Sequence, residues 1–109
     1  MHVLVTGATG FVGRRLVPAL VEAGLGESAL VRDAGAYDPP EGVSVVEGDL
    51  LSPGTFETAF EGVEAAYYLV HSMRSGRDFE ERDRRAAQNF TDAADSAGVS
   101  RVIYLGGLG

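Results

Sequence analysis

Residues 2–16, HVLVTGATGFVGRRL, set an apolar run directly before three glycines and a segment with helical periodicity. The glycines are Gly7, Gly10 and Gly13, spaced three apart. Gly7 allows the backbone angles of a tight turn, Gly10 lets the main chain approach an anion closely, and Gly13 permits close helix-to-strand packing. A strand, a glycine-rich turn and a helix in this order are the arrangement that binds a pyrophosphate.

The start of the helix supplies the groups that would face such an anion. Backbone N–H groups in a first helical turn have no acceptor inside the helix, so we expect those around Phe11 and Val12 to point at the phosphates. Thr9 is expected either to donate its hydroxyl to a phosphate or to cap the helix. The plain alternative is a compact turn that binds nothing. The flanking strand and helix favour binding.

Apolar runs rich in Val, Ile, Leu or Tyr alternate with helical patterns along the chain. Strands are expected at residues 3–6, 28–32, 43–47, 65–70 and 102–105. Helices are expected at residues 11–23, in a short segment that begins at Ser52 and Pro53, and at residues 78–97. Because parallel strands need crossovers, this alternation predicts an α/β, Rossmann-like open parallel sheet, order 3-2-1-4-5, with helices on both faces.

Each expected helix has an apolar face that should pack on this sheet. The predicted buried positions are Val12, Leu16, Ala19, Leu20 and Ala23 in the first helix, Phe56, Ala59 and Phe60 in the short one, and Phe79, Ala86, Phe90, Ala93 and Ala97 in the last. Residues 33–42 contain Gly35, Pro39 and Pro40 and therefore predict a loop.

Composition and charge limit the classes of function. The 109 residues suffice for one domain, residues 1–109. A net charge of −7 argues against a general nucleic-acid binder, and no apolar run approaches the roughly 18 residues of a membrane span, so a cytoplasmic protein is expected. Cysteine is absent, which excludes disulfides and cysteine-ligated zinc, and the absence of lysine excludes the GxxxxGK phosphate loop.

The glycine spacing GxxGxxG differs from the common dinucleotide fingerprint GxGxxG and resembles the short-chain dehydrogenase/reductase superfamily. The resemblance extends over essentially the whole chain through TGATGFVG, ALVRD, VEGDL, AAYYLVHSM, DRRAAQNF and RVIYLGGLG. YLVHSM with RVIYLGGLG is most similar to an atypical NAD(P)H-binding or NmrA-like subgroup, whose full-length members are much longer. The resemblance implies a nicotinamide dinucleotide cofactor.

Arg32 and Asp33 stand at the end of the second expected strand, where a dinucleotide fold reads the adenosine ribose. An acidic residue there accepts from a free 2′-hydroxyl, whereas an arginine compensates a 2′-phosphate. The resemblance carries an NADP-type role onto the arginine of ALVR. NADP(H) is therefore favoured, with NAD(H) as the alternative. A solvated Arg32 paired with a neighbouring acid is the purely structural interpretation.

Two further segments are expected at the ligand. In the resembled family GDL contacts adenine, so Asp49 would accept from the exocyclic amine while Leu50 supplies an apolar surface and a main-chain group; without the resemblance, a turn aspartate fits equally well. Val70, His71 and Ser72 come at the carboxyl end of the fourth strand, where they are expected to contact the cofactor riboses through the backbone. His71 and Ser72 do not form a nucleophile and base, because neighbours on a strand point to opposite faces.

Catalytic residues are not expected within this chain. Reductases of the resembled superfamily carry a tyrosine with a lysine four residues on, and a serine after the fifth strand, but this chain has no lysine and has Gly106 and Gly107 in place of the serine pair. Tyr67, Tyr68 and Tyr104 fall in expected strands, where packing is their simplest role. We assign no catalytic residue and no metal ligand.

The sequence thus predicts the NAD(P)(H)-binding domain of an atypical short-chain-dehydrogenase-like oxidoreductase that acts on a small-molecule substrate. The alternatives are a non-catalytic NmrA-like dinucleotide sensor and a fragment without activity. The chain stops at Gly109 directly after the fifth expected strand. We therefore expect the N-terminal part of a longer protein, whose uncovered sheet surface would favour self-association.

Overall fold

A computed structural model gives the fold, and it describes residues 1–8, 10–69 and 77–104, without the side chains of residues 11 and 77–79. The strands are β1 His2–Thr6, β2 Gly26–Val31, β3 Val43–Glu47, β4 Ala65–Tyr68 and β5 Arg101–Tyr104. The helices are α1 Phe11–Glu22 and α2 Arg77–Ala97, with two short 3-10 helices, η1 Ala34–Ala36 and η2 Glu57–Phe60.

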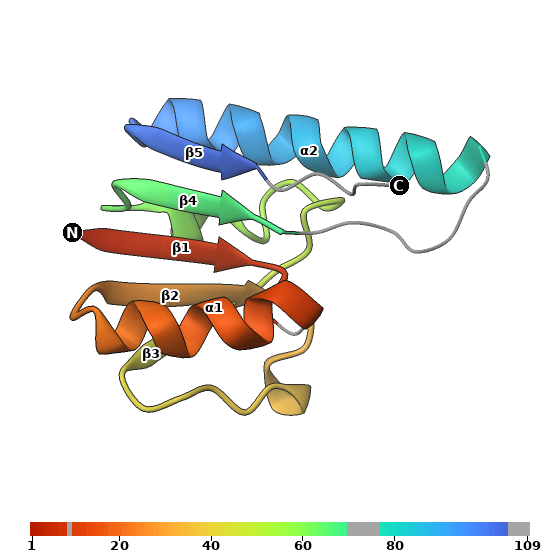
Figure 1. Cartoon of the computed structure of the whole chain (residues 1–109). Coiled ribbons are helices and arrows are strands. Elements are labelled where there is room, and N and C mark those ends of the chain that lie inside the picture. Colours follow the sequence, from red (N-terminus) through yellow and green to blue (C-terminus); the bar gives the residue numbers. More distant parts are fainter. Residues whose placement is uncertain (9, 70–76, 105–109) are drawn as a thin grey trace.

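The five strands form one sheet in the order β3-β2-β1-β4-β5, as the sequence predicts (Figure 1). All four pairings are parallel, and in the centre of the sheet Thr6 stands beside Leu30 of β2 and Tyr68 of β4. The carboxyl ends of all five strands therefore lie at the same end of the sheet. The turn that leads from β1 into α1 lies at this end (Figure 1).

Helices cover both faces of the sheet. Side chains alternate along each strand, so Val3 and Val5 of β1 point to the face that α1 covers, while Leu4 points to the face covered by α2 and η2. Val17 and Leu20 of α1 pack against Val3 and Val5 in one buried cluster. The expected helix-on-both-faces arrangement is therefore confirmed.

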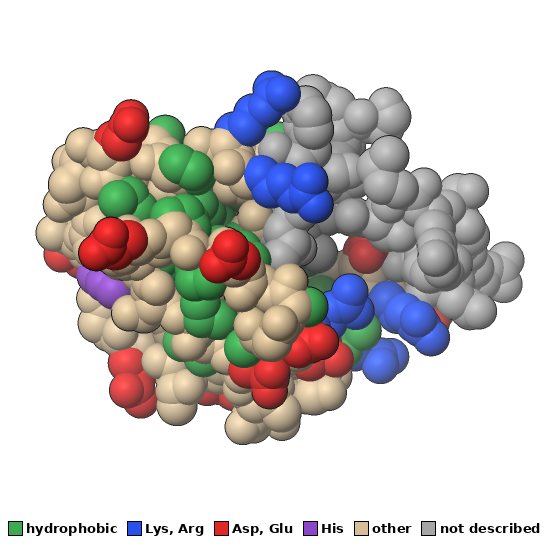
Figure 2. Space-filling view, turned by 90° about the horizontal axis from the view of Figure 1, so that it is seen from below, with side chains coloured by type: hydrophobic (Ala, Val, Ile, Leu, Met, Phe, Trp, Pro, Cys, Tyr) green, Lys and Arg blue, Asp and Glu red, His purple; other side chains and the backbone are tan. Residues whose placement is uncertain are grey.

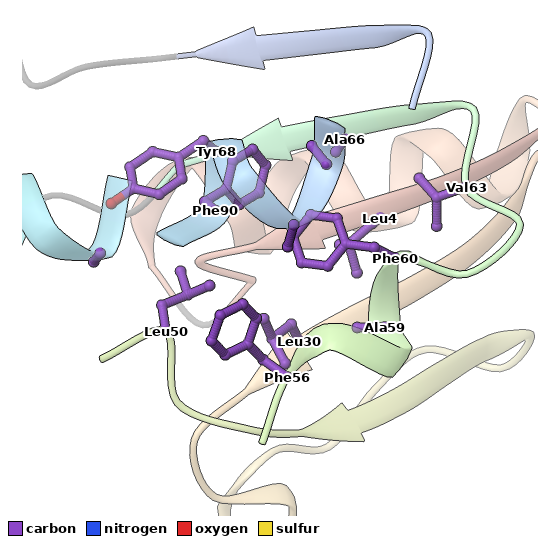
Figure 3. Packing of buried hydrophobic residues seen from close by; sticks show 13 residues of the cluster. Leu4, Leu30, Leu50, Phe56, Ala59, Phe60, Val63, Ala66, Tyr68 and Phe90 are labelled. Carbon is purple, nitrogen blue, oxygen red and sulfur yellow. The ribbon is translucent and has the colours of Figure 1, made fainter. Parts of the chain in front are cut away.

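The second cluster is aromatic (Figure 3). The rings of Tyr68 and Phe90 lie 4.9 Å apart between centroids, those of Phe60 and Phe90 5.2 Å, and those of Phe56 and Phe60 6.3 Å, all edge to face. This is a favourable geometry for buried rings. It fixes η2 and α2 to the same face of the sheet.

The buried face of α1 differs from the predicted one. Val17 and Leu20 are buried as is Gly13, but Val12 is 44% exposed. Ala19 and Ala23, also predicted to be buried, are exposed. The helix is turned so that positions 13, 17 and 20 meet the sheet, because Gly13 must lie against the turn after β1. In α2 the predicted Ala97 is exposed, and Ala94 is buried in its place.

The segment after β3 was expected to form a helix from Ser52 and Pro53, and it forms turns followed by η2 instead. Gly54 has φ +97°, which is not helical, and its N–H donates to the Glu57 carboxylate at 2.9 Å. This bond is the main cause of a lowered pKa for Glu57. The Thr55 hydroxyl donates to the carbonyl of Ser52 at 2.7 Å. Such local side-chain bonds compete with helix formation.

Among the residues that the structure describes, no helix is long and apolar enough to cross a membrane. Val102 and Tyr104 of the edge strand β5 are 45% and 60% exposed. Self-association through this surface stays a prediction.

Candidate functional site

The turn between β1 and α1 has the backbone that its glycines predict. Gly7 has φ +83°, in the region that favours glycine. The N–H of Gly10 donates to the carbonyl of Gly7 at 3.0 Å and closes a tight turn. The turn brings the chain from the end of a central strand directly into the first residue of α1.

Gly13 and Gly10 are glycine for different reasons. A Cβ atom on Gly13 would lie 2.2 Å from the Gly7 carbonyl oxygen and 2.7 Å from Ala8 Cα, which no real structure tolerates. Among the described residues, a Cβ on Gly10 would meet the Gly7 oxygen at 3.4 Å, which is ordinary contact. The packing of the described protein thus demands a glycine at position 13 and leaves the space beside Gly10 open.

The first turn of α1 begins beside this position with N–H groups that have no acceptor inside the helix. Gly10 precedes the helix, its backbone is extended, and no side chain of the described residues caps the helix. The first helical hydrogen bond is from the Arg14 N–H to the Gly10 carbonyl, at 3.0 Å, so the N–H groups of residues 11–13 have no acceptor within the helix. The first turn carries no acidic side chain. These features together favour an anion.

The charge distribution also favours an anion at this edge. Figure 2 shows arginine side chains gathered toward the end of the molecule where the strands finish, with acidic side chains spread over the rest of the visible face. In the sequence, Arg14 and Arg15 belong to the start of α1, Arg32 follows β2, and Arg82 lies in the first half of α2. Arginine side chains are therefore concentrated toward this end of a protein whose net charge is −7.

Two acidic side chains at the ends of β2 and β3, Asp33 and Glu47, accept hydrogen bonds from backbone N–H groups. Asp33 Oδ1 accepts from the Gly35 N–H at 3.0 Å, and Glu47 Oε2 accepts from the Ala34 N–H at 2.9 Å. Arg32 itself is exposed. The carboxylates thus shape the turn that contains η1.

The GDL segment after β3 is fixed by several bonds. Asp49 Oδ1 accepts from the Leu51 N–H at 2.9 Å, and Thr55 Oγ1 accepts from the Asp49 N–H at 3.0 Å. The Leu50 carbonyl accepts from Asn89 Nδ2 at 2.6 Å.

The Leu50 side chain differs from the expectation of an apolar surface for the ligand. It is only 9% exposed and packs with Leu30 and Phe56 in the aromatic cluster (Figure 3). Burial in the core is the more favourable place for a leucine. Asn89 was not identified from the sequence, although it lies beside the buried stripe of Ala86, Phe90 and Ala93, where a polar residue signals an inward hydrogen bond.

Several expected site residues lie outside the described part of the chain. These are Thr9, Val70, His71, Ser72, Gly106 and Gly107, together with the side chain of Phe11. Of the others, Gly7, Gly10, Val12 and Gly13 share one turn, and Arg32 and Asp49 follow the neighbouring strands β2 and β3.

The tyrosines have the packing roles predicted for them. Tyr68 is 2% exposed, and its ring stacks on that of Tyr104 at 5.1 Å. Burial, with smaller contributions from Tyr104 and Asp83, raises the pKa of Tyr68 to about 12. Tyr68 therefore keeps its proton near neutral pH and is not a general base there.

Glu27, at the start of β2, is a buried acid that the sequence analysis did not single out. It is 1% exposed, and neither carboxylate oxygen has a hydrogen-bond partner among the described residues. Burial raises the pKa of Glu27 to about 7. Glu27 lies at the amino end of β2, whereas the glycine turn lies at the carboxyl ends of the strands. Glu27 is therefore expected to affect the stability of the fold and not the binding of a ligand at the glycine turn.

Glu27 predicts a pH-dependent stability. The folded state holds the Glu27 proton more tightly than the unfolded chain, whose pKa is about 4.5, so the free energy of unfolding should fall by on the order of 2 kcal/mol as pH rises from 4.5 to 7. Glu27→Gln should remove this fall in urea unfolding series, whereas Glu22→Gln on exposed α1 should keep it. An unchanged pH profile in Glu27→Gln would refute the assignment.

The parallel sheet, the glycine turn and the open helix start define a Rossmann-type dinucleotide-binding domain. The family whose description is NAD(P)H-binding matches residues 7–109, and the chain belongs to this family. It is a short-chain dehydrogenase/reductase-like NAD(P)-binding domain, as the sequence resemblance implied.

Curated proteins and a solved structure agree with this assignment. The chain is 34% identical to the NAD(P)H azoreductase of Xenophilus azovorans, over 98% of this chain and 36% of that protein. It is 31% identical to the short-chain dehydrogenase/reductase family 42E member 1 of Bos taurus, over 94% of this chain and 28% of that protein. A short-chain dehydrogenase/reductase superfamily protein from Agrobacterium tumefaciens with bound NAD matches with TM-score 0.76 and 29% identity, over 95% of this chain and 32% of that chain.

The chain spans between 26% and 36% of the length of the first curated relatives that it matches.

Proposed function

We propose that the chain binds NADP(H), with the pyrophosphate on the turn of residues 7–13 and the adenosine across the ends of β2 and β3. The observation that carries this proposal is the open space beside Gly10. Packing against the described residues does not require a glycine there, and Gly10 directly precedes a helix start that no side chain of the described residues caps. A phosphate bound close to the backbone of Gly10 would explain both the glycine at this position and the uncapped start of α1.

The preference for NADP(H) over NAD(H) rests on the end of β2. Asp33 and Glu47 each accept one backbone N–H of the turn, so both carboxylates have a role in the loop without any ligand. Arg32 is exposed and can offer a guanidinium to a 2′-phosphate. NAD(H) remains the competing cofactor, since a relative of similar fold has NAD bound.

Replacing Arg32 with alanine should weaken NADPH binding about tenfold or more and NADH binding less than about twofold, because only NADPH carries the 2′-phosphate. Nicotinamide fluorescence titrations at one fixed salt concentration measure both constants. Arg101→Ala, an exposed arginine at the start of β5, is the matched control and should change neither. Equal losses for the two cofactors in Arg32→Ala would refute the assigned role.

The same proposal makes the chain the cofactor-binding domain of an oxidoreductase. The nicotinamide would carry the hydride, and the polypeptide would bind and orient the dinucleotide at the carboxyl ends of the strands. Substrate-dependent oxidation of NADPH over a panel of carbonyl, quinone and azo compounds tests this in the whole protein. Tight cofactor binding without turnover would favour the non-catalytic sensor.

A further inference from the structure

We propose that Asn89 of α2 is a positioning residue that fixes the Asp49–Leu50 segment for recognition of the adenine ring. The inference rests on the proposed function, since it concerns the adenosine end of the same site. It adds a residue from a helix far along the chain to a site otherwise formed by the ends of β1, β2 and β3.

The bond from Asn89 Nδ2 to the Leu50 carbonyl is short, at 2.6 Å, and partly buried. It joins positions 39 residues apart in the sequence. A hydrogen bond shielded from water is held more firmly than an exposed one, and breaking it leaves a carbonyl without its donor. The segment after β3 is therefore tied to α2 at one defined atom.

The other bonds of the segment are local. Asp49 Oδ1 accepts from the Leu51 N–H, and Thr55 accepts from the Asp49 N–H, so these bonds shape the turn without attaching it to the rest of the fold. The Asp49 side chain makes this bond through Oδ1. A carboxylate has a second oxygen, which can accept from an amine of a ligand.

The turn is attached to the body of the protein by packing of Leu50 in the aromatic cluster (Figure 3), by Leu51, which packs against that cluster, and by the Gly48 N–H, which donates to the Val31 carbonyl at 2.9 Å. The Asn89 bond is the contact made to the Leu50 carbonyl itself. Leucine packing resists displacement but sets rotation weakly, whereas a hydrogen bond to the carbonyl fixes the orientation of the peptide plane. The direction of the neighbouring Asp49 carboxylate therefore depends on Asn89.

Asn89 is itself held by the helix. Ala86, Phe90 and Ala93 are buried on the same side of α2 and pack it onto the sheet. Gln88, one residue earlier, is exposed and donates to Asp92 at 2.9 Å. Gln88 is therefore the matched control for a change of side chain at this place on α2.

Asn89→Asp tests the inference, because it keeps the shape and replaces the donor with an acceptor that repels the Leu50 carbonyl. Asn89→Ser, which is neutral, is the second variant. The probes are AMP and inosine monophosphate, whose base has an oxygen in place of the 6-amino group, and inorganic pyrophosphate. Calorimetry gives the affinity of each.

The wild type is expected to bind AMP about tenfold more tightly than inosine monophosphate, since the 6-amino group of AMP donates to Asp49, whereas the 6-oxygen of inosine monophosphate repels the carboxylate. In both Asn89 variants this ratio should fall to below about threefold, while pyrophosphate binding stays within about twofold and Gln88→Ala matches the wild type. A merely structural role would lower the melting temperature without changing the ratio, and that result would overturn the inference. A wild type that binds NADPH but does not discriminate the two nucleotides would also overturn it. A wild type without NADPH binding would instead refute the proposed function.

Discussion

Replacing Gly10 with valine is expected to weaken dinucleotide binding at least about 100-fold while leaving the fold intact. The backbone of Gly10, with φ −79° and ψ 179°, is extended and suits a β-branched residue. Its Cβ would lie 3.4 Å from the Gly7 oxygen, which is ordinary contact with the described residues, so we expect the fold to accept the substitution. The isopropyl group would instead occupy the space over the free N–H groups where the phosphates should lie.

Calorimetric titration of NADPH into Gly10→Val, with urea unfolding of the same variant, measures both halves of this prediction. Ala19→Val adds the same bulk to an exposed position of α1 and should bind like the wild type. Gly10→Ala should bind with intermediate affinity. Undiminished binding by Gly10→Val would mean that the ligand does not lie beside this turn.

Gly13→Ala is expected to lower the free energy of unfolding by about 3 kcal/mol, the upper end of the usual cost of overpacking. The added Cβ would lie 2.2 Å from the Gly7 oxygen and 2.7 Å from Ala8 Cα, and both neighbours are backbone atoms that cannot rotate away. Helix propensity alone predicts the opposite sign, because alanine is favoured over glycine in a helix interior by about 1 kcal/mol.

Packing and helix propensity predict opposite changes in the free energy of unfolding of Gly13→Ala, so chemical unfolding distinguishes the two effects. Chemical unfolding of Gly13→Ala should show a clear loss of stability, and Gly10→Ala, whose Cβ has room at 3.4 Å, should unfold nearly like the wild type. A Gly13→Ala protein as stable as the wild type would show that α1 does not approach the turn after β1 so closely.

The order of the sheet, the tight turn at Gly7 and the close packing at Gly13 could be predicted from the sequence. These features depend on local patterns: apolar runs with a period of two, and glycines placed between a strand and a helix. The different needs of Gly10 and Gly13 were also expected, and the structure supplies the distances for the packing role of Gly13.

The rotation of α1 and the turns before η2 could not be predicted, because they depend on contacts between distant or competing groups. Val12 is exposed since the approach of Gly13 to Ala8 determines which face of α1 meets the sheet. In the segment after β3, bonds from Thr55 and Glu57 to the backbone oppose a helix that Ser52 and Pro53 alone would start. Side-chain bonds of this kind are not visible in hydrophobic periodicity.

The roles of Asn89 in the site and of Glu27 in the core could likewise not be predicted from the sequence. The partner of Asn89 lies 39 residues away, and no local spacing connects them. Glu27 lies just outside the strand expected at residues 28–32, and its side chain is 1% exposed in β2. Tertiary packing decides both.

The central claim is that the turn of residues 7–13 binds the pyrophosphate of a nicotinamide dinucleotide, and calorimetric titration of NADPH into the wild-type chain tests it most directly. Circular dichroism and cooperative unfolding of the same sample first establish that the chain is folded. We predict saturable binding at one site per chain, weakened by added salt and lost in Gly10→Val. A folded wild-type chain that shows no saturable binding of NADPH or NADH would contradict the claim.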